Sequence, residues 1–190
     1  MDIIRNKIVQ NVINDSEIIR DIEHEKRKDP KFDINLGCSE YNCSLLIRAV
    51  LQNRKDLVEY LLSSPDINVN HIANNGNTVL YACIQVSILK LFLNRKDLVV
   101  VNTQNIWGET ELHSSCWWGR KACVRELLLD ARVNTYIRDD RGKMPQDYAL
   151  KRGYPGIAKI IGNSGRTSLL RIPNASLLHD IVRMIIEEYV

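Results

Sequence analysis

The sequence predicts an all-α solenoid in which helix–turn–helix units stack side by side and are joined by short β-hairpin fingers. Similar segments begin at Ser44, Thr78, Thr110 and Met144, at steps of 34, 32 and 34 residues. In these segments apolar residues recur in pairs spaced i, i+1, i+4 and i+5, which places a broad apolar stripe on one helical face. One helix pair cannot bury that stripe alone, so the repeats must stack to form a core.

Glycine and asparagine recur in the same frame. Three of the four segments have a glycine two residues before their first position, which suits a turn that needs a positive φ. The first three second helices are each followed by a loop that ends at an asparagine. These residues are Gly76, Gly108 and Gly142, and Asn70, Asn102 and Asn134.

The stretch 107–134 resembles one ankyrin repeat, a unit of about 33 residues that contains the motif T-P-L-H-x-A. Thr110-Glu111-Leu112-His113 stands where T-P-L-H stands, and Gly119 stands at the break between the two helices. The resemblance implies an ankyrin solenoid with helical caps at both ends. In that family the first helices line a concave groove, and the motif histidine ties its turn to neighbouring backbone.

Residues 1–40 form a degenerate N-terminal cap repeat in this interpretation. Residues 1–13 are apolar at helical spacing, and Asn14 with Glu17 three residues later matches a capping box that starts a second helix. That helix ends in a charged run before Pro30. The next repeat covers residues 41–73, with Ile47 in the histidine position.

The repeat at 74–105 is shortened. From the first position of each segment to the second helix there are 13 residues in the other three repeats, but only 10 from Thr78 to Ile88. We expect Gln85-Val86-Ser87 to make the turn after a shorter first helix. The deletion is either tolerated without consequence or leaves a notch in the groove that admits a side chain of a partner.

The chain ends in a repeat at 106–139, a last repeat at 140–162, and a linker with a capping helix at 163–190. The glycines in the sequence GNSG at 162–165 predict a break, followed by a short basic linker at 166–174. Apolar residues at helical spacing then predict a helix at 176–189. The whole of residues 1–190 is read as one ankyrin-repeat domain.

Composition and net charge limit the classes of partner and the cellular setting that we expect for this chain. The net charge is +3, from 26 basic and 23 acidic residues, so no strong attraction to nucleic acid or membrane is expected. No run is long and apolar enough to cross a bilayer, and charges interrupt the first apolar stretch, so no secretion signal is expected. Five cysteines without a C-x-x-C pair favour a reduced, cytoplasmic setting. For a virus or an intracellular microbe, that setting would be the cytosol of the host cell.

The sequence contains no constellation typical of catalysis. His24, His71, His113 and His179 lack the spacing of a metal site, and there is no phosphate-binding glycine loop or paired-carboxylate motif. We therefore expect no enzyme activity, no metal, no cofactor and no small-molecule substrate.

The ankyrin resemblance implies a monomeric protein-interaction module that binds another protein through its concave groove and fingers. Fold alone does not fix function, so this remains an expectation. An alternative is an adaptor or a microbial or viral effector that recruits a second protein, such as ubiquitin-ligase machinery, through the C-terminal helix. Ile172-Pro173 before that helix resembles the start of an F-box. The candidate contact residues are Arg48, Gln52, Asn75, Asn77, Trp107, Glu109, Trp117, Trp118, Arg141, Lys143 and Arg152.

Overall fold

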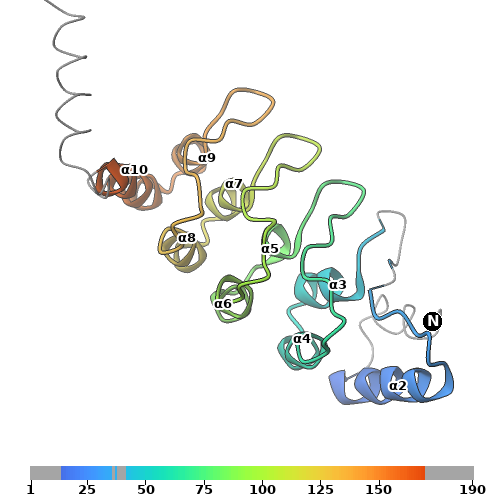
Figure 1. Ribbon diagram of the computed structural model, residues 1–190. Helices are drawn as coiled ribbons and strands as arrows, with labels where there is room; N and C mark the ends of the chain where they lie inside the picture. Colours follow the sequence, from blue (N-terminus) through green and yellow to red (C-terminus); the bar gives the residue numbers. More distant parts are fainter. Residues whose placement is uncertain (1–13, 36, 38–41, 170–190) are drawn as a thin grey trace, which may run out of the picture.

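The fold is a stack of helix pairs, as the repeat period predicts (Figure 1). The structure, a computed structural model, describes residues 14–35, 37 and 42–169. Their helices are α2 (Asp15–Lys28), α3 (Leu45–Leu51), α4 (Lys55–Leu62), α5 (Val79–Ala82), α6 (Val86–Leu93), α7 (Glu111–Trp117), α8 (Lys121–Leu127), α9 (Pro145–Lys151) and α10 (Pro155–Leu169).

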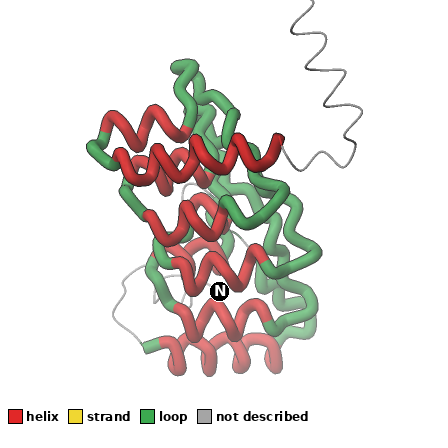
Figure 2. The backbone as a smooth tube through the Cα atoms, turned by 90° about the vertical axis from the view of Figure 1, so that its left-hand side faces the viewer, coloured by secondary structure: helices red, strands yellow, loops and turns green. Residues whose placement is uncertain are grey.

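The helices form two rows. One row holds the first helices α3, α5, α7 and α9, and the other holds α2, α4, α6, α8 and α10, with neighbours in contact along each row. Figure 2 shows the helices lying side by side across the stack, with the longer loops at one side and the short helix–helix turns at the other. The predicted all-α ankyrin solenoid is confirmed.

The core runs continuously between the two rows. Ile47, Leu61, Leu89 and Phe92 are each at most 1% exposed, and Ile161 is 3% exposed near the last helix. These residues come from the predicted apolar pairs and from the first helices. Because each repeat contacts only its neighbours, the core is built one interface at a time.

The helix α2 confirms the prediction at Asn14. The Asn14 side-chain oxygen accepts a hydrogen bond from the Glu17 backbone N–H at 2.9 Å, which satisfies one of the free donors of the first turn. Ile18 and Ile22 are fully buried, and α2 packs on α4. Asp15 forms an ion pair with Arg54 at 2.8 Å. The helix expected within residues 1–13 lies outside the described residues.

The fingers are tight hydrogen-bonded loops. In the second finger the Asn105 N–H donates to the Glu109 carbonyl at 3.0 Å, and the Gly108 N–H donates to the Asn105 carbonyl at 2.9 Å. Gly108 has φ +75°, and an added Cβ would lie 2.6 Å from the Asp140 nitrogen of the next finger. The hairpins are therefore turns without extended strands in the described part of the chain.

The shortened repeat folds differently from our expectation. Its first helix has only four residues, but α6 already begins at Val86, so the turn is made by residues 83–85 and not by Gln85-Val86-Ser87. The Arg120 guanidinium of the next repeat donates to the Cys83 carbonyl at 3.2 Å. A side chain of the chain itself thus reaches the place of the deletion, which favours a tolerated deletion over an open notch.

The expected break at Gly162–Gly165 is wrong, because α10 continues through these residues to Leu169. Glycine costs a helix about 1 kcal/mol relative to alanine, but burial of an apolar face outweighs that cost. Ile157, Ala158 and Ile161 provide this face, and α10 packs on α9 and α8. The helix expected at 176–189 lies outside the described residues.

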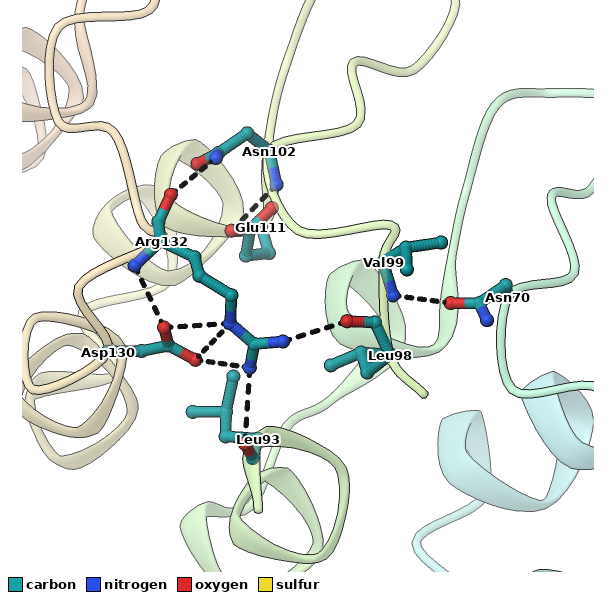
Figure 3. Close-up of polar contacts among 8 residues, drawn as sticks. All are labelled: Asn70, Leu93, Leu98, Val99, Asn102, Glu111, Asp130 and Arg132. Carbon is teal, nitrogen blue, oxygen red and sulfur yellow. Dashed lines mark hydrogen bonds and ion pairs between the residues drawn. The ribbon is translucent and has the colours of Figure 1, made fainter. Parts of the chain in front are cut away.

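Loop side chains link one repeat to the next (Figure 3). The Asn102 amide donates to the Arg132 carbonyl at 2.7 Å and accepts from the Asn134 N–H at 2.8 Å. Asn70 bridges in the same way to the Asp97 carbonyl and the Val99 N–H. Two of the three recurring asparagines therefore staple adjacent loops.

The Arg132 guanidinium strengthens the same contact between repeats. It donates to the Leu98 carbonyl at 2.8 Å and to the Leu93 carbonyl, at the end of α6, at 3.2 Å, while Asp130 holds it at 2.6 Å. A cation at the carboxyl end of a helix is favourable for the helix dipole and satisfies a free carbonyl.

Candidate functional site

The inner side of the third and fourth repeats carries a hollow that we call the aromatic groove. It consists of two adjoining cavities of about 320 and 240 Å³, and both are lined by Trp117, Arg141 and Tyr148. The first cavity is also lined by Lys143, Asp147, Leu150 and Lys151, and the second by Tyr81, Glu109, Ser114 and Trp118. The helices α7 and α9 supply its base, and the fingers supply its rim.

Trp117 is the half-buried centre of the groove. Its ring meets the edge of the Tyr148 ring at a centroid distance of 5.6 Å. The Arg152 guanidinium lies 4.6 Å from the Trp117 ring centroid, and the Lys151 ammonium lies 5.7 Å away. A cation over an indole face is attracted by the ring's electron density, so both long side chains are held near the groove.

Two tyrosine hydroxyls and two carboxylates form the polar base of the groove. The Glu109 carboxylate accepts a hydrogen bond from the Tyr81 hydroxyl at 2.9 Å, and the Tyr148 hydroxyl shares its single proton between Glu109, at 2.9 Å, and Asp139. Burial, and then the hydrogen bonds to carboxylates, raise the pKa of Tyr81 and Tyr148, so both hydroxyls remain protonated donors. The network joins three repeats.

Asp139 stays ionised within this base. Burial raises the pKa of its carboxyl, but hydrogen bonds from Tyr148 and from the backbone N–H groups of Lys143 and Arg141 outweigh it, and the net pKa is lowered. The backbone donors lie at 2.7 Å and 3.0 Å. Asp139 therefore shapes the third finger, which carries Arg141 and Lys143.

His113 positions the same finger from below. Its Nδ1 accepts the Thr110 N–H at 3.1 Å, and its Nε2 lies 3.0 Å from the Lys143 carbonyl, to which it donates. Burial lowers the pKa of His113, which keeps the ring neutral and fits this pattern of one acceptor and one donor. The predicted role of this histidine in tying backbone together is confirmed.

The structure brings about half of the candidate contact residues together. Glu109, Trp117, Trp118, Arg141 and Lys143 line the aromatic groove. Arg152 also belongs there, because its Nε donates to the Trp117 carbonyl at 3.2 Å in addition to the ring contact.

The other candidates lie elsewhere. Arg48 is on α3 and Gln52 ends it, so both belong to the first full repeat, outside the residues that line the groove. Asn75 and Asn77 shape the first finger, where the Asn75 side chain accepts the Asn77 N–H at 3.1 Å. Trp107 is at the tip of the second finger and is 48% exposed.

Our sequence reading missed several lining residues, namely Tyr81, Ser114, Asp147, Tyr148, Leu150 and Lys151. The repeat frame contained a signal for three of them. Counted from Ser44, Thr110 and Met144, the candidate Arg48 shares one position with Ser114 and Tyr148, and Trp117 shares another with Lys151. A groove position found in one repeat therefore indicates its equivalent in the next.

Two further kinds of feature, a metal-binding cluster and a membrane-spanning helix, are not found among the described residues. No group of three or more His, Cys, Asp or Glu side chains in residues 14–35, 37 and 42–169 is placed to hold a metal ion. None of the helices in that part of the chain has the length and apolar character needed to cross a membrane.

Comparison with known proteins identifies the repeats. Residues 45–137 match the family model described as ankyrin repeats in three copies. The chain is also similar to the SMC5-SMC6 complex localization factor protein 1 of Bos taurus, with 28% identity over 153 residues, and of Homo sapiens, with 26% identity over 152 residues. Each match covers 79% of this chain but only 13% of the relative.

Proposed function

We propose, from the premise that this chain is an ankyrin-repeat protein, that it acts by binding another protein through the aromatic groove and the finger tips. The described array is treated as one interaction domain, working as a monomer and without catalysis or cofactor. Arg48, Gln52, Asn75 and Asn77 then form a secondary contact area on the first repeats.

The observation that carries this proposal is the exposure of tryptophan beside a hollow. Trp118 ends α7 and is 59% exposed, next to the half-buried Trp117, and Trp107 is 48% exposed on the adjacent finger. An indole left in water forgoes the stabilisation of burial, and tryptophan and arginine are the residues most enriched at binding hot spots. A bound partner would bury both side chains.

The relatives support a binding role without naming a partner for this chain. They are named localization factors of a protein complex, and this chain aligns with one short region of them. Because that region is 13% of their length, we infer for this chain only that it binds protein. Cys83, Cys116 and Cys123 are buried and free, which supports our proposal of a reduced intracellular setting.

Affinity capture with matched variants tests the proposal. Wild type, Trp118→Ala and Tyr136→Ala are immobilised and exposed to the same lysate, and the retained proteins are quantified by mass spectrometry. Tyr136 is the matched control, because it is an aromatic residue with the same 59% exposure but lies outside the groove lining. We expect a protein retained by wild type and by Tyr136→Ala but lost from Trp118→Ala.

The melting curves of the three proteins must coincide for this comparison, and the exposure of both side chains leads us to expect that they do. Equal retention of every captured protein by Trp118→Ala and by the double variant Trp107→Ala/Trp118→Ala would refute the groove as the binding surface.

A further inference from the structure

The cations around the aromatic groove have no anionic partner among the residues that the structure describes. Arg141, Lys143 and Lys151 line the first cavity and Arg152 stacks on Trp117, yet none of the four forms an ion pair with any residue that the structure describes. All four are exposed. Four cations that form no ion pair with a described residue therefore gather around an aromatic hollow.

Three arginines elsewhere in the chain are paired with carboxylates. Arg54 pairs with Asp15 at 2.8 Å, Arg95 with Asp97 at 2.7 Å, and Arg132 with Asp130 at 2.6 Å. Arg95 and Arg132 also hold neighbouring repeats together, since each donates to a backbone carbonyl of the preceding repeat. Arg54 links the first full repeat to α2 through its ion pair. In contrast to these three arginines, the four cations at the groove form no ion pair with a described residue.

The acidic groups near the groove do not offset these cations by pairing with them. Glu109 accepts from two tyrosine hydroxyls, Asp139 from Tyr148 and two backbone N–H groups, and Asp147 from the Met144 N–H at 2.9 Å. Asp140, on the finger tip, is exposed and lies against Gly108 of the neighbouring finger. The carboxylates at the base are thus directed to internal donors, while the four cations are exposed.

We propose that the aromatic groove takes an acidic peptide segment of the partner protein, which deepens the proposed function and rests on it. One aromatic or aliphatic side chain enters the cavity of about 320 Å³ beside Trp117 and Leu150. That volume is at the small end of ligand pockets, so it suits a side chain and not a folded element. Flanking Asp or Glu side chains pair with Arg141, Lys143, Lys151 and Arg152.

An acidic peptide bound in this way should show a fast association rate and an affinity that depends on salt. Exposed charges at the rim of an interface raise the association rate, and salt screens them at distances beyond about 8 Å at physiological ionic strength. The apolar anchor supplies affinity that salt does not remove. Binding should therefore weaken with salt without being abolished.

A random peptide display library provides an unbiased test. The library is panned on the full chain, and the enriched peptides are sequenced and labelled for fluorescence anisotropy. We expect enrichment of Asp and Glu on both sides of one large apolar residue. The affinity of an enriched peptide should fall at least about tenfold in Arg141→Glu/Lys143→Glu, as for charge reversal at a paired rim.

The matched control is Lys121→Glu/Arg125→Glu, which makes the same charge change with two exposed residues of α8 in the other row. It should leave the affinity within about twofold, since charges beyond a Debye length are screened. Arg141→Gln/Lys143→Gln, which removes charge without reversing it, should give an intermediate loss. Circular dichroism confirms that each variant is folded.

The possible contrary outcomes separate the two proposals. Enrichment of basic or uncharged peptides, bound equally by Arg141→Glu/Lys143→Glu, overturns the acidic specificity and leaves protein binding in place. Self-association of wild type that the charge reversal abolishes would mean that a second copy occupies the groove, and also overturns it. Failure of wild type to enrich any peptide above the Trp118→Ala variant counts against the proposed function itself and the inference with it.

Discussion

Glu111 gives this array a stability that depends on pH near neutrality. It occupies the first position of α7, where T-P-L-H has proline, and is only 2% exposed. Its carboxyl accepts a long hydrogen bond from the Asn102 N–H at 3.4 Å (Figure 3). Burial raises the pKa of Glu111 to about 7, hydrogen bonds from the backbone of Glu111 itself and of Asn102 lower this pKa only in part, and the nearby Asp130 adds to the rise.

The direction of the pH dependence follows from the protonation of Glu111 in the folded and in the unfolded chain. Between the ordinary pKa of 4.5 and about 7, the folded protein keeps a proton that the unfolded chain has released. The stabilisation is therefore complete below pH 4.5 and lost as pH rises through 7. At about 1.4 kcal/mol per pKa unit the full effect is about 3 kcal/mol, of which about 2.5 kcal/mol falls between pH 5 and 8.

The assay is urea unfolding of wild type and Glu111→Gln at pH 5 and pH 8, followed by circular dichroism and by tryptophan fluorescence. We expect the free energy of unfolding of wild type, relative to Glu111→Gln, to be larger at pH 5 than at pH 8 by about 2.5 kcal/mol. Other groups such as His113 and Asp139 titrate equally in both proteins and cancel. Glu59→Gln, at an exposed position of α4, controls for loss of a surface carboxylate.

A difference that stays constant within about 0.5 kcal/mol between the two pH values would refute the reasoning, because a surface substitution alone produces no more than that. It would mean that Glu111 is already ionised in the folded chain at pH 5. Coincident curves from the two probes are needed for a single free energy of unfolding.

Two further substitutions test the backbone and the contacts between repeats. Gly119→Ala should lower the free energy of unfolding, measured in urea, by about 1–3 kcal/mol. The reason is that Gly119 has φ +66° and an added Cβ would lie 2.5 Å from the Tyr154 ring. An unchanged urea midpoint would contradict this prediction. Arg132→Gln should cost about 1 kcal/mol, a value kept small by its 40% exposure, since the Leu93 and Leu98 carbonyls lose a charged donor. Arg125→Gln, at an exposed position of α8, is its control, and equal midpoints for the two would show that the contact contributes nothing.

The repeat period could be predicted from the sequence because the spacing of apolar residues indicates which face of each helix is buried. Leu57, Val58 and Leu61 recur with the helical period, and the structure buries all three. The start of α2 at Asn14 was likewise predicted, since a capping side chain bonds a backbone group only three residues away. Such signals need no knowledge of the rest of the chain.

The incorrect sequence predictions concern features in which local preference and tertiary packing compete. Gly162 and Gly165 lower helix propensity, but α10 continues because its apolar face packs on α8 and α9. Asn134 recurs in sequence with Asn70 and Asn102, yet its side chain accepts from its own loop, at Tyr136 N–H, and makes no bridge to another loop in the described part of the chain. Position in a repeat does not reveal whether a neighbour is there to be bonded.

The sequence by itself determined the helical repeat, the order of its units and the candidate aromatic residues, because these depend on spacing along the chain. Only the tertiary structure decided which of them form one surface. The contacts of Tyr148 with Glu109 and of Arg152 with Trp117 join residues 39 and 35 positions apart. They form only once α7, α9 and their fingers stack in a definite register, and the energy that sets this register is burial spread over the whole core.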